Sequence, residues 1–558
     1  MTPRARMRPA PRMRPAPNVT RLLLAAVVVI AAGCGGGDGR RPARFEAADP
    51  APPRPAAALP PAVRQQLLDG ALTVLGRLDA YDEAAAFAQV FDRLNQWSHG
   101  AIAAAGDGQP AWSLDPLHGT LPPVLRAVAD ADALESGVFV AEVDVPALRD
   151  QRWLADIAAS ARGDAVDDVE VARNLFAWTV RSLAITSDPP LVPTDATPGT
   201  RWFSLGDVLL AGRASGAQRA WVFLELLRHA GLDGVMLATG DAAAGPLRPW
   251  LPALVSGGEA FLFEPVYGLP VPGPEGAGVA TVRQAAADPA ILRALSLPDR
   301  AYPVQAADLA KLSVLVPAAP VNLARRMHLL DGQLAGVAKV DLAIAATELG
   351  ATALAALPGP ADPGRVRLWE FPWETARRGR AAAVAAAAAQ ELAPFVVALE
   401  ATVPDGRETR RTVRPLYAAR LREFRGELDG PDGAKAAYML ARPSAVVIAD
   451  VVKRSPSGQA AGLERLYETM KEDATYWLGV LTLGEGQYET AVDYLGRMVL
   501  EAAPDSRWAD AARTNLAAAQ AALGRTAEAI ALLRADTSPQ RFGSRLTAAR
   551  LEKAAAPR

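Results

Sequence analysis

Few residues in this sequence have the chemistry of a catalytic nucleophile or a metal ligand. The chain has one cysteine, Cys34, and four histidines, His99, His118, His229 and His328. These residues lack the short spacings that zinc-binding motifs share. We therefore expect no metal site and no cofactor.

Ser215 and His229 are the nearest approach to a serine-histidine pair. They lie at opposite ends of one predicted helix. At a rise of ~1.5 Å per residue, their side chains would be about 20 Å apart. A nucleophile must lie within hydrogen-bond reach of its base. We therefore predict no catalytic residue here.

The sequence around Ser215 predicts a helix followed by three strands. The helix covers residues 216–230 and ends at Gly231. Three short β-favouring runs follow, at 235–238, 250–255 and 260–263. Gly257 and Gly258, between the last two runs, indicate a two-residue hairpin turn.

These residues resemble the transglutaminase-like superfamily over about residues 165–275. The resemblance rests on a turn of small residues, a helix that ends in Leu-Leu-Arg before Gly-Leu, and two downstream motifs. The matching residues are Gly212, Ala214, Gly216, Ala220, Leu226-Leu227-Arg228, Gly231-Leu232, Arg248-Pro249-Trp250, Phe261-Leu262-Phe263-Glu264-Pro265 and Tyr267-Gly268-Leu269. The resemblance implies a papain-like α/β core.

In that family a cysteine, a histidine and an aspartate form the catalytic triad. In this sequence Gly216 is at the cysteine position, Arg248 at the histidine position and Glu264 at the carboxylate position. Glycine offers no nucleophile, and an arginine with a pKa above ~12 cannot act as a base near neutral pH. The resemblance therefore implies a catalytically silent domain.

The polar residues of this region allow two further hypotheses about their role. Arg248 and Glu264 could form a structural ion pair. Alternatively, Arg248, Glu264, Gln218 and Arg219 could line a remodelled cleft that serves a hydrolase or an acyl-transfer enzyme.

Four tryptophans flank the same region. Trp178 and Trp221 lie on apolar helix faces, so we expect them in the core. Trp202 and Trp250 are better candidates for the wall of a cleft, because aromatic side chains are enriched at binding sites.

The N-terminal residues are typical of an export signal. An arginine-rich segment precedes an apolar run at 22–32, which is too short to span a bilayer comfortably. Ile30-Ala31-Ala32-Gly33-Cys34 resembles the bacterial lipobox, although Ala31 stands where leucine is commoner. The resemblance implies that residues 1–33 are a signal peptide and that Cys34 is acylated, with palmitate among its acyl chains. A free cysteine after an ordinary secretory signal is the alternative, and either Met1 or Met13 could be the start.

An acylated Cys34 would anchor the protein in a lipid bilayer of the bacterial cell envelope. Several acyl chains exceed what stable anchoring requires. Residues 34–61, rich in Gly, Pro and Ala, predict a flexible tether. Gly35 rather than aspartate after the cysteine favours the outer membrane, facing the periplasm. A lone cysteine forms no intramolecular disulfide.

The composition predicts a globular protein of several parts. The chain has 558 residues, 50% of them hydrophobic, and a net charge of -2, so it lacks the basic character of a nucleic-acid-binding protein. The expected parts are a helical region with the transglutaminase-like domain at 62–300, a mixed α/β region at 301–405 and a helical region at 406–558. The last part should be helical from about Arg410 to its end.

Two C-terminal segments resemble tetratricopeptide repeats. The first contains Tyr476-Trp477-Leu478-Gly479, Gly486, Tyr488, Ala491 and Pro504, and the second contains Asn515-Leu516-Ala517, Gly524, Ala529 and Leu533. The small residues let two antiparallel helices approach closely, and each hairpin must stack on a neighbour. Predicted helices at 415–424, 433–440 and 460–471 would supply degenerate repeats. The resemblance implies a protein or peptide partner; a helical hairpin without a binding role is the alternative.

The sequence as a whole predicts an α+β, helix-rich fold. We expect a lipid-anchored envelope protein that binds or scaffolds a protein or peptide through its C-terminal repeats. The competing hypothesis is an enzyme that uses a remodelled transglutaminase-like cleft.

Overall fold

The protein folds as an α+β molecule rich in helices. The computed structural model describes residues 59–105, 112–188, 201–240, 246–334, 339–404, 408–456 and 458–555. Residues Ala56–Arg558 form one compact unit. The predicted coarse class is therefore confirmed. The predicted signal peptide, its Cys34 and most of the predicted tether lie outside the described residues.

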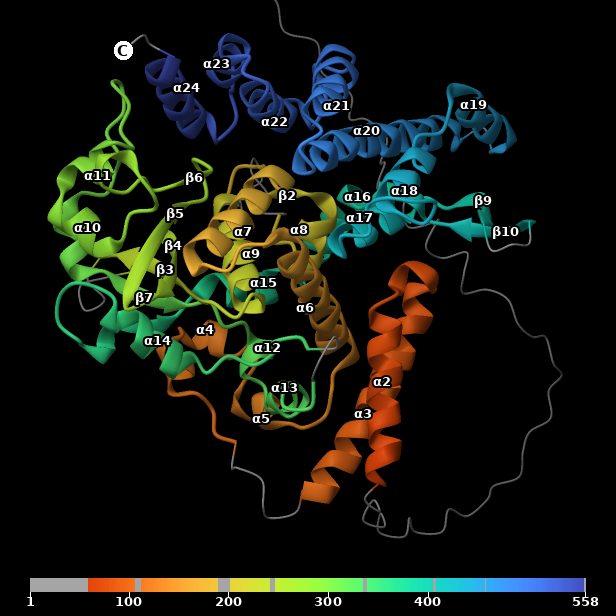
Figure 1. Ribbon diagram of the computed structural model, residues 1–558. Coiled ribbons are helices and arrows are strands. Elements are labelled where there is room, and N and C mark those ends of the chain that lie inside the picture. Colours follow the sequence, from red (N-terminus) through yellow and green to blue (C-terminus); the bar gives the residue numbers. More distant parts are fainter. Residues whose placement is uncertain are drawn as a thin grey trace, which may run out of the picture. The chain divides into compact units, whose positions relative to one another are not determined.

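A six-stranded sheet lies beside helix α9 (Figure 1). Its strands are β3 (Asp233–Thr239), β4 (Arg248–Ser256), β5 (Glu259–Glu264), β6 (Leu269–Pro270), β7 (Ser313–Val316) and β8 (Val366–Leu368), in the order β6-β5-β4-β3-β7-β8. All neighbours are antiparallel except β7 and β8. The three predicted strands are confirmed. Gly257 and Gly258 form the predicted turn, with φ angles of 59° and 76° that favour glycine.

The sheet continues across the boundary that we predicted at residue 300. Strand β7 hydrogen-bonds to β3, and β8 hydrogen-bonds to β7. Both strands belong to the predicted middle region. The middle region and the preceding part therefore share one sheet.

Helix α9 (Gly216–His229) confirms the predicted helix and packs on this sheet. Its start is fixed by a capping box: Gln218 N donates to Ser215 Oγ at 3.2 Å, and Ser215 N donates to Gln218 Oε1 at 2.9 Å. Helices α6 (Ala141–Ala161) and α7 (Asp168–Ser182) cover its other sides. Most α9 side chains are therefore buried.

Helix α7 ends at Ser182 and is followed by a short strand. Leu183 is extended, and Ala184–Ile185 form strand β1. β1 pairs in parallel with β2 (Arg213–Ala214), with Ala184 N donating to Gly212 O at 2.8 Å. This pairing places the segment that precedes α9 next to the end of α7.

Further helices form the N-terminal and middle regions. They are α2 (Pro61–Leu75), α3 (Glu83–Ala105), α4 (Pro123–Arg126), α5 (Ala131–Glu135), α8 (Leu205–Ala211), α10 (Val282–Ala287), α11 (Pro289–Arg293), α12 (Pro320–Leu323), α13 (Arg325–Asp331), α14 (Ala346–Ala355), α15 (Glu370–Arg378) and α16 (Ala382–Glu391). Helices α10 and α11 are separated at Asp288, and Pro289 is the first residue of α11.

The C-terminal region begins with a hairpin rather than a helix. Strands β9 (Leu399–Pro404) and β10 (Glu408–Val413) pair antiparallel, so the expectation of helix from Arg410 is wrong. Threonine and valine at 409, 412 and 413 favour strands. The helices start at residue 415.

Eight further helices follow, and the last five run from right to left along the top of Figure 1. They are α17 (Pro415–Phe424), α18 (Ala434–Leu440), α19 (Ala445–Arg454), α20 (Ala460–Gly484), α21 (Tyr488–Val492) with its π-helical continuation η9 (Asp493–Glu501), α22 (Ala509–Ala522), α23 (Thr526–Arg534) and α24 (Arg541–Ala555). The predicted helix at 415–424 is confirmed, and the one at 460–471 is the first half of α20.

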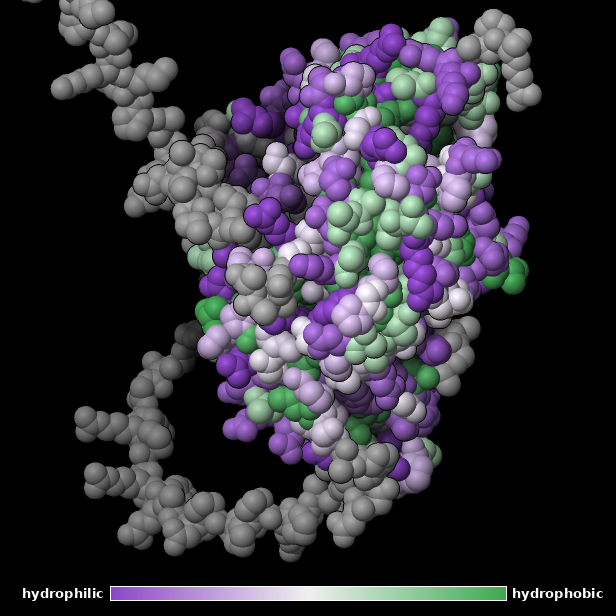
Figure 2. All heavy atoms as spheres, turned by 90° about the vertical axis from the view of Figure 1, so that its left-hand side faces the viewer, coloured by the Kyte–Doolittle hydropathy of each residue, from purple (hydrophilic) through white to green (hydrophobic). Residues whose placement is uncertain are grey.

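The surface mixes polar and apolar side chains. Figure 2 shows the face on the left of Figure 1, where hydrophilic residues border a pale, weakly hydrophobic band. Within the described residues, the length and apolar character needed to cross a bilayer are not found in any helix.

Candidate functional site

A side chain at residue 216, at the N-terminal end of α9, would require Val266 to move. A Cβ atom added to Gly216 would lie 2.6 Å from Val266 Cγ2, closer than real Cβ atoms approach other atoms. Val266 follows β5 and occupies the space that a side chain at 216 would need. The position that the family resemblance aligns with a nucleophile is therefore filled by an apolar neighbour.

Glu264, at the aligned carboxylate position, is bound inside the fold. Tyr302 Oη donates to Glu264 Oε2 at 2.8 Å, and Val266 N donates to Glu264 Oε1 at 3.0 Å. Trp250 Nε1 donates to Tyr302 Oη at 3.0 Å, which completes a buried chain of hydrogen bonds. Burial raises the pKa of Glu264, although these donors lower it in part. The Glu264 carboxyl group therefore has a structural role, as the acceptor of these internal hydrogen bonds.

Arg248, at the aligned histidine position, is exposed at the start of β4. The ion pair that we considered between Arg248 and Glu264 does not form among the described residues, because Glu264 is buried and takes its hydrogen bonds from Tyr302 and Val266. The three aligned positions therefore do not assemble a catalytic triad.

Gln218 and Arg219 have structural partners. Gln218 caps α9 and donates through Nε2 to Arg201 O at 3.1 Å. Arg219 is 2% exposed, and burial lowers its pKa to about 9. Its guanidinium donates to four neutral acceptors, which are Leu183 O at 2.8 and 2.5 Å, Pro265 O at 3.0 Å, Gln540 Oε1 at 2.7 Å and Val180 O at 3.4 Å. Arg219 thus joins α7, the β5 loop and the C-terminal segment.

The C-terminal helices cover this end of α9. The Gln540 side chain lies on Arg219 and 3.0 Å from the place of a Cβ at Gly268. Gly543, in α24, lies so close to Tyr267 O that a Cβ would collide with it. The region that follows β5 is therefore packed beneath the start of α24.

An apolar cavity of about 380 Å³ lies on another side of α9. Trp202 and the largely buried Trp221 border it. Gly216, Arg248 and Glu264 do not line this cavity, so the expectation that Trp202 forms a wall of the transglutaminase-like cleft stays a prediction. Trp250 is not part of the wall; it binds Tyr302 instead. Trp178 is buried in the core, as expected.

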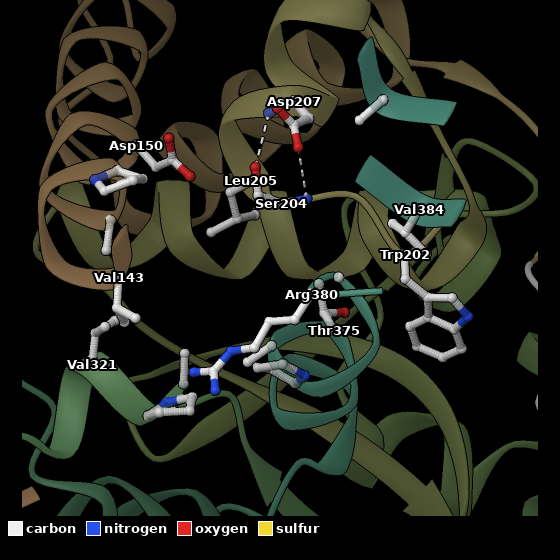
Figure 3. A pocket seen from close by; sticks show the side chains of 18 of the residues that line it. Val143, Asp150, Trp202, Ser204, Leu205, Asp207, Val321, Thr375, Arg380 and Val384 are labelled. Atoms are coloured by element: carbon white, nitrogen blue, oxygen red, sulfur yellow. Dashed lines mark hydrogen bonds between the residues drawn. The ribbon is translucent and has the colours of Figure 1, made fainter. Parts of the chain in front are cut away.

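Figure 3 shows how polar side chains lie around this cavity. Ser204 and Asp207 form the capping box of α8, with hydrogen bonds of 3.2 and 3.3 Å. Asp150 accepts from Gly206 N at 2.9 Å and pairs with Arg149, while burial raises the pKa of Asp150. Arg380 extends across the cavity toward the side of Val321 (Figure 3). The lining therefore combines apolar walls with two carboxylates, Asp150 and Asp207, that already have structural partners.

No group of three or more metal-binding side chains occurs in the described part of the chain. His118 hydrogen-bonds Ala129 O at 3.2 Å, and His229 hydrogen-bonds Gln151 Oε1 at 2.7 Å. Burial lowers the pKa of His229 well below its usual value. These two histidines have structural partners.

The cavities could not be predicted from the sequence, because their walls combine segments that are far apart in the chain. The cavity at Trp202 draws on α6, α8, α15 and α16, and a larger groove lies between α7 and the C-terminal helices. Local periodicity gives no signal for such assemblies.

In comparisons with known proteins, the chain matches no family model, no curated protein and no solved structure.

Proposed function

We propose that this chain is a lipid-anchored envelope protein with a catalytically silent transglutaminase-like core. Its C-terminal helices form tetratricopeptide-like hairpins that bind or scaffold a protein or peptide. Cys34 carries the lipid anchor, and the envelope site is the outer membrane facing the periplasm. The protein needs no metal and no cofactor for this role.

The main support for a catalytically silent core is the position of Val266 beside residue 216. Val266 takes the place of any side chain on Gly216, so even a cysteine there would have to displace it. Glu264 is bound by Tyr302, and Arg248 points its charge to solvent from the edge of β4. A nucleophile, a base and an orienting carboxylate must touch one another for acyl transfer.

The close approach of the C-terminal helices supports the repeat assignment. A Cβ on Gly479 would lie 2.7 Å from Leu495, so α20 and η9 touch because residue 479 is glycine. Ala491, Ala517 and Ala529 are fully or almost fully buried between helices. Small residues at helix contacts are what stacked helical hairpins require.

Activity assays test the silent core. The purified chain without residues 1–34 is expected to show no amine incorporation, no peptidase activity and no amidase activity. An activity that disappears in Arg248→Ala or Glu264→Ala would overturn the proposal and establish the competing enzyme hypothesis, because both residues belong to the suggested remodelled cleft.

Capture from native membranes tests the binding role. Ala518→Arg places a long side chain on an exposed position of α22 that borders the groove toward α7, and is expected to abolish capture of the partner. Ala531→Arg, on an exposed position of α23, is the matched control and should leave capture unchanged. Equal capture by both variants would contradict a partner site on this face.

Labelling tests the anchor. The wild-type chain is expected to incorporate labelled palmitate and to remain with membranes, whereas Cys34→Ala should do neither. Membrane association without label, retained in Cys34→Ala, would rule out lipid anchoring at this residue.

A further inference from the structure

A groove of about 670 Å³ separates α7 from the C-terminal helices. Its walls include Arg181 on α7, Gly484 at the end of α20, Asn515 on α22 and Gln540 before α24; we call it the seam groove. A cavity of about 260 Å³ adjoins it, because Asn515 and Gln540 line both spaces. Both spaces lie between the core and the C-terminal helices, and we call the two of them together the channel.

Arg181 is a cation without a partner in the seam groove. In the described part of the chain, no hydrogen bond or ion pair engages its guanidinium. Its Nη2 lies against Gly484, 3.3 Å from the place of a Cβ there. Burial lowers the pKa of Arg181, and the charge of Glu423 opposes this shift only in part. Arg420 and Tyr438 already bind the Glu423 carboxylate. Its N–H groups are therefore available to a ligand.

Arg219 adds a second positive charge at the floor of the adjoining cavity. All its donors are used, and every acceptor is neutral. The guanidinium therefore contributes charge without a free hydrogen bond. Interactions with such a charge are strong because water is largely excluded around it.

The other arginines along the channel have carboxylate partners. Arg173 pairs with Glu170 at 2.7 Å and Arg507 with Asp473 at 2.5 Å, whereas Arg213 shares Glu391 with Arg201 and Arg507. Asp510, which lines the adjoining cavity, pairs with Arg513. Among the described residues, Arg181 and Arg219 are therefore the channel arginines that no carboxylate binds directly.

We propose that the seam groove binds an extended acidic protein segment, with one of its carboxylates held by Arg181. The groove is polar and basic, and a guanidinium binds a carboxylate through short charge-assisted hydrogen bonds. Gly484, Ala518 and Ala522 give the opposite wall small side chains, which leaves space for a peptide backbone. The inference rests on the proposed binding role of the C-terminal helices and specifies the chemistry of the partner.

The charge pattern favours an acidic peptide over a nucleic acid. Nucleic acids carry a charge at every phosphate and are bound by several cations along their backbone. Arg181 and Arg219 are only two positive charges, and they lie close together. Two such charges suit a ligand with one carboxylate at Arg181 and a second acidic group nearby. Affinity for the segment should fall as salt concentration rises, since the attraction is electrostatic.

Fluorescence anisotropy with the detergent-solubilised full chain tests the proposal. The probe is a short fluorescein-labelled peptide of alternating glycine and glutamate, and its matched control replaces glutamate by glutamine. We expect the glutamate peptide to bind and Arg181→Gln to weaken it about tenfold, as loss of a charged hydrogen bond predicts. Arg497→Gln is the control variant, because Arg497 is exposed, pairs with Asp493 at 2.8 Å and does not line the groove, and it should change affinity less than about threefold.

Gln540→Glu gives a second test that does not depend on removing an arginine. The new carboxylate would accept hydrogen bonds from Arg219 and add negative charge to the channel. It should therefore weaken binding of the glutamate peptide, while the midpoint of thermal unfolding stays the same or rises. Equal binding of the two peptides, or equal loss of affinity in Arg181→Gln and Arg497→Gln, would overturn the proposal. Binding of inorganic phosphate or oligothymidylate with an affinity equal to that of the glutamate peptide would overturn it too. If Ala518→Arg still abolishes capture of the envelope partner in those cases, the proposed binding role stands and only its acidic chemistry fails.

Discussion

Glu264 is a buried carboxyl group whose protonation is coupled to folding. Its pKa is raised in the folded protein by burial, above the ordinary value of 4.5. The folded state therefore holds a proton that the unfolded state has released, and stability falls as pH rises from about 4.5 toward the folded pKa. The greatest slope that one such group contributes is about 1.4 kcal/mol per pH unit.

Glu264→Gln is expected to remove this part of the pH dependence. An uncharged amide cannot ionise, so the difference in unfolding free energy between variant and wild type should shift in favour of the variant as pH rises from 5 to 7. Urea unfolding at each pH measures it. Glu259→Gln, on the same strand but in a more exposed pair with Arg283, is the control and should show no such trend. A constant difference between Glu264→Gln and wild type would contradict the prediction.

Single residues were partly predictable from the sequence. Residue types alone show that Gly216 lacks a nucleophile and Arg248 lacks a base. The neighbour that fills the space is Val266, which is remote in sequence and reaches Gly216 only through the loop after β5. Tyr302 as the partner of Glu264 likewise depends on chain folding over a long loop, for which sequence spacing gives no signal.

At the scale of elements, Arg219 connects pieces that are far apart in the chain. It binds the end of α7, the loop after β5 and the segment before α24 through one guanidinium. A buried acceptor that loses its donor costs about 1 to 3 kcal/mol. The attachment of α24 to the core therefore depends on this side chain.

Arg219→Met is expected to lower the unfolding free energy by about 3 kcal/mol or more, because several buried acceptors lose their donor together. Amide hydrogen exchange should also quicken around residues 538–545, where Gln540 and Gly543 meet the core. Arg513→Met, which removes a surface pair with Asp510 on α22, should cost less than about 0.5 kcal/mol. Unchanged exchange at 538–545 would show that Arg219 does not hold α24.

Elements with strong local signals were predicted well. Helix α9 has a capping box at Ser215 and a glycine stop at Gly231, and both are visible as sequence. The two-residue strands β1 and β2 and the hairpin β9–β10 were missed. Two-residue strands such as β1 and β2 gain their stability from partners elsewhere in the chain, so their own residues say little.

At the scale of the whole molecule, the predicted parts share one interior. The buried apolar cluster includes Leu68 in α2, Leu254 in β4 and Trp477 in α20. Trp477 packs on Gly212 so closely that a Cβ there would collide with its ring. Long-range contacts of this kind are invisible to periodicity, which is why composition suggested separate parts at 62–300, 301–405 and 406–558.

The shared interior predicts that residues 59–558 unfold together. Strands β7 and β8 cannot pair without β3, and the C-terminal helices would expose Trp477 and Arg219's partner Gln540 if they separated from the core. Scanning calorimetry of the chain that starts at Gly35 should therefore show one cooperative transition, with matching calorimetric and van't Hoff enthalpies. Two resolved transitions, one of them retained in a fragment that ends at Pro404, would instead mean that the C-terminal helices are an independent domain and that the seam groove opens without unfolding. A single transition would mean that any partner entering the seam groove must fit the gap left between folded elements.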